Sequence, residues 1–151
     1  MTLNIYDRTA LAELVHGYAA AIDDRRFDDA ADLFTDTAEL QLPDPPQFLE
    51  PIRHHTGREE IRSALEAVAA VLRTQHAIVG ELYTGGGDAN HAHGRIACEA
   101  HHWTQHGEGI SDVVWHLRYD DEYVRTGPGW RIQLRALTIN AIETRPMRRV
   151  R

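Results

Sequence analysis

Cysteine is almost absent from this sequence, because Cys98 is the only one among 151 residues. No disulfide can form within the chain, so a reducing compartment is expected. Long apolar runs are also absent, since none approaches the roughly 20 residues that span a bilayer. The segment Met1–Asp7 lacks the basic and apolar parts of a secretory signal. These absences predict a cytoplasmic protein with no membrane partner.

Basic residues are outnumbered: 16 basic against 23 acidic side chains give a formal net charge of −7. Nucleic acids and anionic membranes favour basic surfaces, so we expect neither as a partner. The one basic run, Arg145–Arg151, is interpreted as a solvated tail. The length fits a single domain over residues 1–151, with a core large enough to need neither disulfides nor a metal.

The first half of the sequence has the apolar periodicity of helices. Apolar residues recur at steps of three and four between residues 7 and 23, and this stripe consists of Leu11, Leu14, Val15, Tyr18 and Ile22. A short second helix is expected over Phe27–Phe34. A third helix is expected from Gly57 to about Arg73.

The second half has the pattern of strands. Residues 38–42 already alternate, and four longer segments follow at about 75–84, 92–104, 110–125 and 129–142. Short glycine-containing turns separate them, which favours an antiparallel meander. Helices followed by a curved antiparallel sheet are typical of the α+β class.

Four prolines interrupt the segment 43–56, at positions 43, 45, 46 and 51. Proline removes a backbone donor and restricts its neighbour, so we expect an irregular loop here. Loops of this length are often functional. Its apolar residues Phe48, Leu49 and Ile52 are predicted to close the mouth of a pocket.

Five short strings occur in the order and spacing of a known family: Tyr18–Phe27, Leu33–Asp36, Thr74–His76, Arg118–Arg125 and Gly129–Ile132. Together they resemble the SnoaL-like branch of the nuclear transport factor 2-like superfamily over nearly the whole chain. This resemblance implies a cone, in which a curved antiparallel or mixed sheet packs on three N-terminal helices and encloses one apolar pocket. The superfamily contains enzymes and plain binders, so the fold alone does not choose a function.

The resemblance also implies site residues. Scytalone dehydratase, bile-acid 7α-dehydratase and hexachlorocyclohexane dehydrochlorinase carry an Asp at the end of the first helix and a His on the strand after the third. Asp23 and His76 match these catalytic positions. Tyr18 matches a site tyrosine of the bile-acid enzyme, and His101 matches by position a second histidine of scytalone dehydratase. Tyr18 and His101 are therefore expected to bind substrate.

A His–Asp pair in an apolar pocket can act as a general base. The carboxylate fixes the imidazole tautomer and stabilises the imidazolium that forms on proton removal. From the residues alone, Asp23 can equally be a solvated helix-end residue and His76 a hydrogen-bonded structural histidine. Tyr18 can likewise serve only to pack the core.

Two further residues are candidates for substrate binding. Side chains alternate along a strand, so only one of two faces can line the pocket. We place Glu99 and His101 inward, and His102 outward. Arg135 could bind a substrate anion, although a solvated strand arginine is the alternative.

Metal and cofactor motifs are incomplete. His91 and His93 have ligand chemistry, as do His101 and His102, but no further spacing completes a zinc signature. The run Gly85–Gly87 is followed by neither Lys-Ser/Thr nor a helix start, unlike a phosphate loop. We therefore expect no metal and no organic cofactor.

Three functions remain open. The first is a cofactor-free lyase or isomerase acting on a bulky apolar molecule, such as a polyketide- or steroid-like ring. The second is a non-catalytic small-molecule-binding module, and the third is the structural small subunit of a ring-hydroxylating dioxygenase. We also expect a homo-oligomer, dimer or trimer, because one strand face gathers large apolar groups that a monomer rarely exposes: Val113, Trp115, Leu117 and Tyr119.

Overall fold

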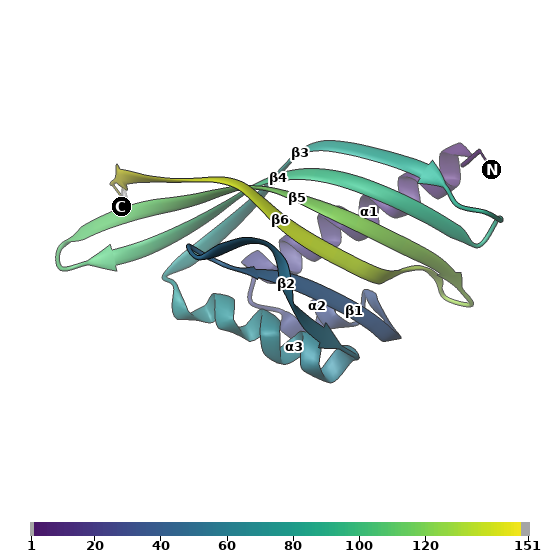
Figure 1. Cartoon of the computed structure of the whole chain (residues 1–151), viewed down its shortest axis with the longest axis horizontal. Helices are drawn as coiled ribbons and strands as arrows, with labels where there is room; N and C mark the ends of the chain where they lie inside the picture. The colour runs from purple at the N-terminus through teal and green to yellow at the C-terminus, as the bar shows by residue number, and fades with distance from the viewer. Residues whose placement is uncertain (1, 149–151) are drawn as a thin grey trace.

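The computed structural model describes residues 2–148, which form three α-helices and a six-stranded mixed sheet (Figure 1). The helices are α1 (Ile5–Asp23), α2 (Phe27–Ala31) and α3 (Arg58–Glu66), and a 3₁₀ turn, Ala67–Ala70, follows α3. The strands are β1 (Phe34–Asp44), β2 (Phe48–Thr56), β3 (Arg73–Gly85), β4 (His91–His106), β5 (Gly109–Thr126) and β6 (Gly129–Met147). This is the expected α+β cone.

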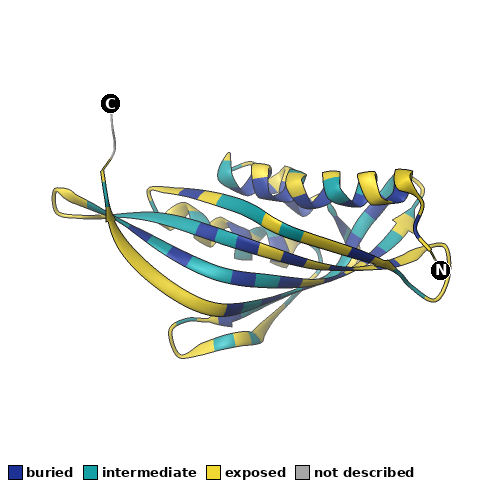
Figure 2. Cartoon of the chain, turned by 90° about the horizontal axis from the view of Figure 1, so that it is seen from above, coloured by how far each residue is buried: buried dark blue, intermediate teal, exposed yellow. Residues whose placement is uncertain are grey.

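The sheet has the order β2-β1-β6-β5-β4-β3. Strands β3 to β6 form an antiparallel meander, as expected, and β1 pairs with β6 in parallel. Figure 2 shows α1 lying along one face of this curved sheet, with buried residues on the strand side of the helix. The apolar stripe of α1 thus closes one side of a space that the sheet curves around.

The end of α1 is attached to the segment that follows α3. Arg25 adopts a left-handed backbone conformation with φ of 61° just after the helix. Its guanidinium donates to the carbonyl oxygens of Val68 and Val71, both at 2.9 Å. These bonds fix the C-terminal end of α1 beside the start of β3, where Asp23 and His76 lie.

The second and third helices are shorter than predicted. Helix α2 ends at Ala31, and Phe34 already begins β1. Helix α3 ends at Glu66 and passes through the 3₁₀ turn before β3 begins at Arg73. None of the helices within residues 2–148 is long and apolar enough to cross a bilayer.

The segment 43–56 is not an irregular loop, so that prediction is wrong. It belongs mostly to an antiparallel hairpin of β1 and β2. Pro51 lies in β2, which is the edge strand of the sheet. An edge strand has unpaired backbone groups on one side, so a missing N–H there costs no ladder bond.

The predicted basic tail is also revised. Strand β6 extends to Met147, so Arg145 lies on a strand rather than in a tail. Residues 149–151 of that predicted tail lie outside the described residues.

Candidate functional site

An apolar cavity of about 320 Å³ lies between the helices and the inner face of the sheet. This volume is at the lower end of the range for small-molecule sites. Helices α1 and α3 form one side, and strands β3 to β6 form the other. The walls include Tyr18, Ile22, Leu65, Val68, His76, Ala100, His102, Trp115, Leu117, Tyr119 and Leu137.

His76 lies in the wall of this cavity, and Asp23 contacts it from the end of α1. The Nδ1 of His76 lies 2.7 Å from Oδ1 of Asp23, and the backbone N–H of His76 donates to Oδ2 at 2.8 Å. Thr74 donates its hydroxyl to Oδ1 at 3.0 Å. The side chains of His76 and Asp23 are only 9% and 22% exposed. The carboxylate therefore holds His76 by both its ring and its backbone.

The electrostatics of this pair favour an ionised carboxylate. Burial alone would raise the pKa of Asp23, but hydrogen bonds from the His76 ring, the His76 backbone and Thr74 hold it below its usual value. An ionised carboxylate can only accept, so Nδ1 of His76 carries the proton. The other ring nitrogen, Nε2, remains for a ligand in the cavity.

The second histidine of the cavity is His102, not His101. The Nδ1–H of His102 donates to the carbonyl oxygen of Val113 at 3.0 Å, and its ring lies 4.4 Å from that of Trp115. Burial lowers the pKa of His102, although the hydrogen bond to Val113 opposes this effect. His102 therefore presents a neutral ring whose Nε2 can accept a hydrogen bond.

His101 and Glu99 lie on the opposite face of β4, so their predicted inward placement is wrong. His101 pairs with Asp112 at 2.7 Å and lies 3.9 Å from Glu99. The sequence pattern of β4 indicates which of its two faces is buried. The even-numbered residues of β4 are small or apolar, and a buried face needs such residues: Ala92, Gly94, Ile96, Cys98 and Ala100. His102 continues this series.

Tyr18 lines the cavity from α1 and is 5% exposed. Its ring makes edge contacts with Phe34 and Tyr119. Burial raises the pKa of the Tyr18 hydroxyl, and the charge of Arg135 opposes the shift. The hydroxyl is therefore protonated near neutral pH and can donate to a ligand oxygen.

Arg135 points inward but does not line the cavity. It is fully buried, and Nε and Nη2 donate to the two oxygens of Asp121 at 2.9 and 2.7 Å. Its guanidinium carbon lies 4.3 Å from the ring centre of Tyr18 and 4.1 Å from that of Tyr119. Arg135 thus supports two tyrosines of the cavity wall from behind.

The β1–β2 hairpin borders the cavity, but through other residues than predicted. Phe48 and Ile52 are 52% and 44% exposed, and neither they nor Leu49 line the cavity. Pro43, Asp44, Pro45 and Arg53 do. The hairpin therefore contributes a wall, and the predicted apolar gate is wrong in its residues.

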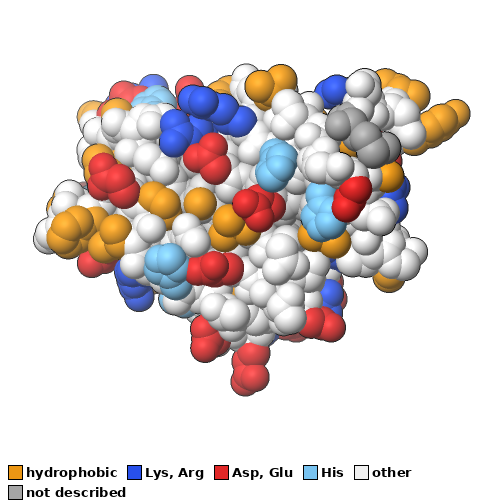
Figure 3. Space-filling model, turned by 45° about the vertical axis from the view of Figure 1, so that its right-hand side comes forward, with side chains coloured by type: hydrophobic (Ala, Val, Ile, Leu, Met, Phe, Trp, Pro, Cys, Tyr) orange, Lys and Arg blue, Asp and Glu red, His pale blue; other side chains and the backbone are white. Residues whose placement is uncertain are grey.

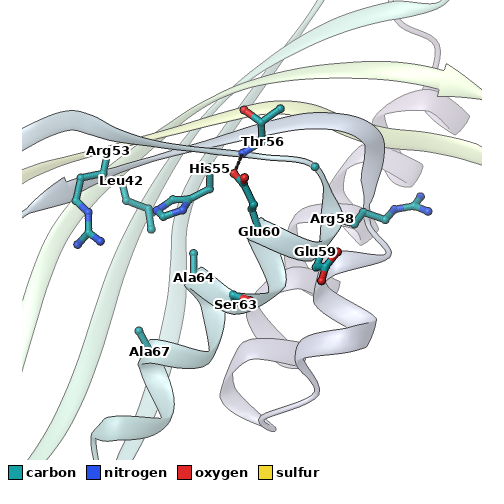
Figure 4. A pocket seen from close by; sticks show the side chains of 11 residues that line it. Leu42, Arg53, His55, Thr56, Arg58, Glu59, Glu60, Ser63, Ala64 and Ala67 are labelled. Atoms are coloured by element: carbon teal, nitrogen blue, oxygen red, sulfur yellow. Dashed lines mark hydrogen bonds between the residues drawn. The ribbon is translucent and has the colours of Figure 1, made fainter.

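An open groove of about 900 Å³ lies between β2 and α3 (Figure 4). Arg53 and His55 come from β2, and Ser63 and Ala64 come from α3. Four residues line both the groove and the cavity: Leu42, Arg53, Ala64 and Ala67. The groove therefore adjoins the cavity.

The apolar strand face that predicted an oligomer has a different role. Trp115, Leu117 and Tyr119 line the cavity, so they face the interior rather than an outer surface. They no longer argue for a partner surface, and the homo-oligomer stays a prediction. Figure 3 shows acidic, basic and histidine side chains interspersed on one face of the molecule.

His91 and His93 were predicted as possible metal ligands and lie at the start of β4. His91 binds Asp88, with 2.7 Å between Nδ1 and Oδ1. Within residues 2–148, no group of three or more His, Cys, Asp or Glu side chains is arranged to hold a metal ion.

Comparison with known proteins gives one family match and several structural matches. The family model described as "SnoaL-like domain" matches residues 4–136. A solved structure from Novosphingobium aromaticivorans has a TM-score of 0.80 and 23% identity, covering 97% of this chain and 96% of that one. The Kfla4162 protein from Kribbella flavida has a TM-score of 0.76 and 29% identity, covering 91% and 93%.

A hexachlorocyclohexane dehydrochlorinase has a TM-score of 0.75 and 18% identity, covering 97% of this chain and 92% of that one. No curated protein matches the chain. The structural matches below 25% identity show the fold, and the chemistry rests on the site itself. With the family model spanning most of its length, this chain belongs to the SnoaL-like domain family.

Proposed function

We propose that this protein is a cofactor-free lyase or isomerase that moves a proton on a bulky, mostly apolar small molecule, such as a polyketide- or steroid-like ring. The observation that supports this most is that His76, in the wall of an apolar cavity, is hydrogen-bonded to Asp23 behind it. A surface His–Asp pair would be screened by water, whereas this one is largely excluded from it.

The proposed chemistry begins with proton removal from carbon. Nε2 of His76 takes the proton, and the ionised Asp23 stabilises the resulting imidazolium. General-base help of this kind contributes about 10²–10⁴-fold. In an isomerase, the imidazolium returns the proton to another carbon. In a lyase, it protonates the departing group, so that a hydroxyl leaves as water.

Two other cavity residues orient the substrate in this proposal. The neutral His102 accepts a hydrogen bond from a substrate hydroxyl through Nε2. Tyr18 donates to a substrate oxygen, which gains negative charge as His76 removes the proton. The apolar walls bind the rest of the molecule by burying its surface.

A non-catalytic binding module is the alternative, because an apolar cavity binds a ligand with or without chemistry. No feature within residues 2–148 specifically favours the dioxygenase small subunit. The experiment is a thermal-shift screen of ring compounds that carry a carbonyl or hydroxyl, since a ligand raises stability by RT ln(1 + [L]/Kd). Each hit is then incubated with the protein in D₂O.

The two functions give different results in this experiment. An enzyme incorporates deuterium at a carbon of the hit, or converts it to product, and loses this activity in His76→Ala. A binding module shows the thermal shift alone. Stabilising hits that neither exchange nor react in the wild-type protein would therefore contradict the enzyme and support the binder.

A further inference from the structure

Arg53 is the only arginine among the described residues that line the cavity, and the sequence contains no lysine. It lies on β2 opposite Leu42 of β1, and both side chains line the groove as well as the cavity. Side chains alternate along a strand, so His55, two residues further on, also faces the groove. Arg53 therefore places a positive charge where the cavity adjoins the groove.

The guanidinium of Arg53 is available to a ligand. Within residues 2–148 it makes no hydrogen bond, and its one ion pair, with Asp44, is long at 3.9 Å. Both side chains are more than half exposed, so this pair contributes little to folding. Arg58 of the same groove instead donates to the carbonyl oxygen of Phe34 at 2.9 Å and pairs with Asp36. The fold thus uses the charge of Arg58, whereas that of Arg53 remains available.

The acidic side chains of the groove leave Arg53 accessible to an anion. Figure 4 shows Arg53 toward one end of the groove and Glu59 toward the other. Glu60 accepts from the backbone N–H of Thr56 at 2.8 Å, so its carboxylate already has a donor. Among the described residues, Asp44 is the only carboxylate within 4.0 Å of the guanidinium. Arg53 is therefore where the groove attracts an anion most.

The cavity alone is small for the bulky substrate of the proposed function. Its volume of about 320 Å³ is at the lower end for small-molecule sites, whereas the adjoining groove has about 900 Å³ of open space. A ring system that fills the cavity must extend any further part of the molecule into the groove. The wall that both spaces share has one charged residue, Arg53, so a negatively charged extension fits it best.

We propose that Arg53 is an anion subsite, and that the ligand is a ring compound with a carboxylate on a short side chain. The ring occupies the cavity beside His76, and the carboxylate accepts two parallel hydrogen bonds from the guanidinium of Arg53 in the groove. The inference rests on the proposed function and deepens it by naming the substrate class as a carboxylic acid. Arg53 determines affinity and specificity and takes no part in proton transfer.

Acids and their amides test this subsite, because a primary amide has nearly the shape of a carboxylate but no charge. The probes are naphthylacetic, naphthylpropanoic and naphthylbutanoic acid, each compared with its amide by calorimetric titration near neutral pH, where the acids are ionised. Several chain lengths are used because the reach from the ring to Arg53 selects one of them. The acid of the best length should bind the wild type about fivefold more tightly than its amide, as for an ion pair partly open to solvent.

Three variants locate the cause of this preference. Arg53→Gln keeps a polar side chain but removes the charge, so affinity for the acid should fall to that for the amide, which should not change. Asp44→Asn removes the neighbouring carboxylate and should bind the acid at least as tightly as wild type. Arg95→Gln is the matched control, because Arg95 is an exposed arginine on the outer face of β4, where it lines a separate hollow. The same change in net charge there should leave the preference intact.

The subsite would be overturned if no acid binds, if every acid binds the wild type no better than its amide, or if the preference survives in Arg53→Gln. Equal loss of acid and amide in Arg53→Gln would show a structural role instead. Loss of the preference in Arg95→Gln would show a general charge effect, and weaker acid binding in Asp44→Asn would show that the anion does not compete with Asp44. These titrations need no turnover, so failure of the proposed function is seen separately. An acid that binds through Arg53 but neither exchanges nor reacts in D₂O contradicts the lyase or isomerase and leaves the subsite intact.

Discussion

Both carboxylate oxygens of Asp23 are committed to His76: Oδ1 to the ring nitrogen Nδ1 at 2.7 Å, and Oδ2 to the backbone N–H at 2.8 Å. One residue at the end of α1 thus fixes both the tautomer of the imidazole and its place at the start of β3. The backbone hydrogen bond also joins β3 to the end of α1. The Asp23–His76 contact therefore joins α1 to β3 and also orients the imidazole.

The depressed pKa of Asp23 predicts a contribution to stability that depends on pH. A carboxyl with a lower pKa in the folded state stabilises the fold above its unfolded value, and the gain is lost as pH falls through the folded pKa. The ordinary pKa of an Asp side chain is 3.8, so the loss should occur below about this pH. Urea unfolding from pH 6 to 3 should show a steeper decline for wild type than for Asp23→Asn.

Asp32→Asn is the control for this prediction, because Asp32 is an exposed carboxyl. It should follow the wild-type profile. Equal pH profiles for wild type and Asp23→Asn would show that the hydrogen bonds to Asp23 contribute nothing to folding.

His102 and His101 should differ in a ligand-binding assay, although they are adjacent in sequence. His102→Ala removes an acceptor from the cavity, and should weaken binding of a hydroxyl-bearing ligand by about 1 kcal/mol, or roughly fivefold. His101→Ala lies on the other face of β4 and should leave affinity unchanged. Calorimetric titration of one thermal-shift hit measures both. Weaker binding in His101→Ala together with unchanged binding in His102→Ala would show that His101, not His102, faces the cavity.

Arg135→Met alone should destabilise the fold, because it leaves Asp121 buried without a counter-charge. The expected loss is about 3–5 kcal/mol in the free energy of unfolding. Adding Asp121→Asn should recover much of it, since no net charge then remains buried. Urea unfolding of the two variants tests this. An Arg135→Met variant as stable as wild type would contradict the claim that the buried Asp121 depends on Arg135 for its counter-charge.

The Asp23–His76 contact could be predicted from the sequence because both residues lie at element boundaries that the patterns locate. The apolar stripe of α1 runs to Ile22, and Asp23 follows it directly. His76 lies near the start of the strand after the third helix. Family resemblance then pointed to the pair. The small even-numbered residues of β4 also indicate that His102 faces inward, whereas the matching family position pointed to His101.

The partner of Arg135 could not be predicted, because strand register depends on irregularities that leave no clear sequence signal. Thr126 pairs with Gly129 at the β5–β6 turn, and a regular hairpin would set Arg135 opposite Asp120. The register shifts between Glu122 and Tyr123, and Arg135 instead lies opposite Asp121. The β1–β2 hairpin was also missed, because its prolines predicted a loop. Proline is tolerated on an edge strand, but the sequence does not show that β2 is one.

The most direct test is the turnover of wild type, Asp23→Asn, His76→Ala and the double variant on any substrate found by the screen, with thermal melts alongside. The His101–Asp112 pair on the other face of β4 provides the control. His101→Ala removes a histidine that contacts an aspartate at the same 2.7 Å. If Asp23 and His76 act as a unit, each single change lowers kcat by about 10²–10⁴, and the double variant is little worse. The control keeps wild-type turnover. Full activity in His76→Ala, or losses that multiply in the double variant, would contradict the account.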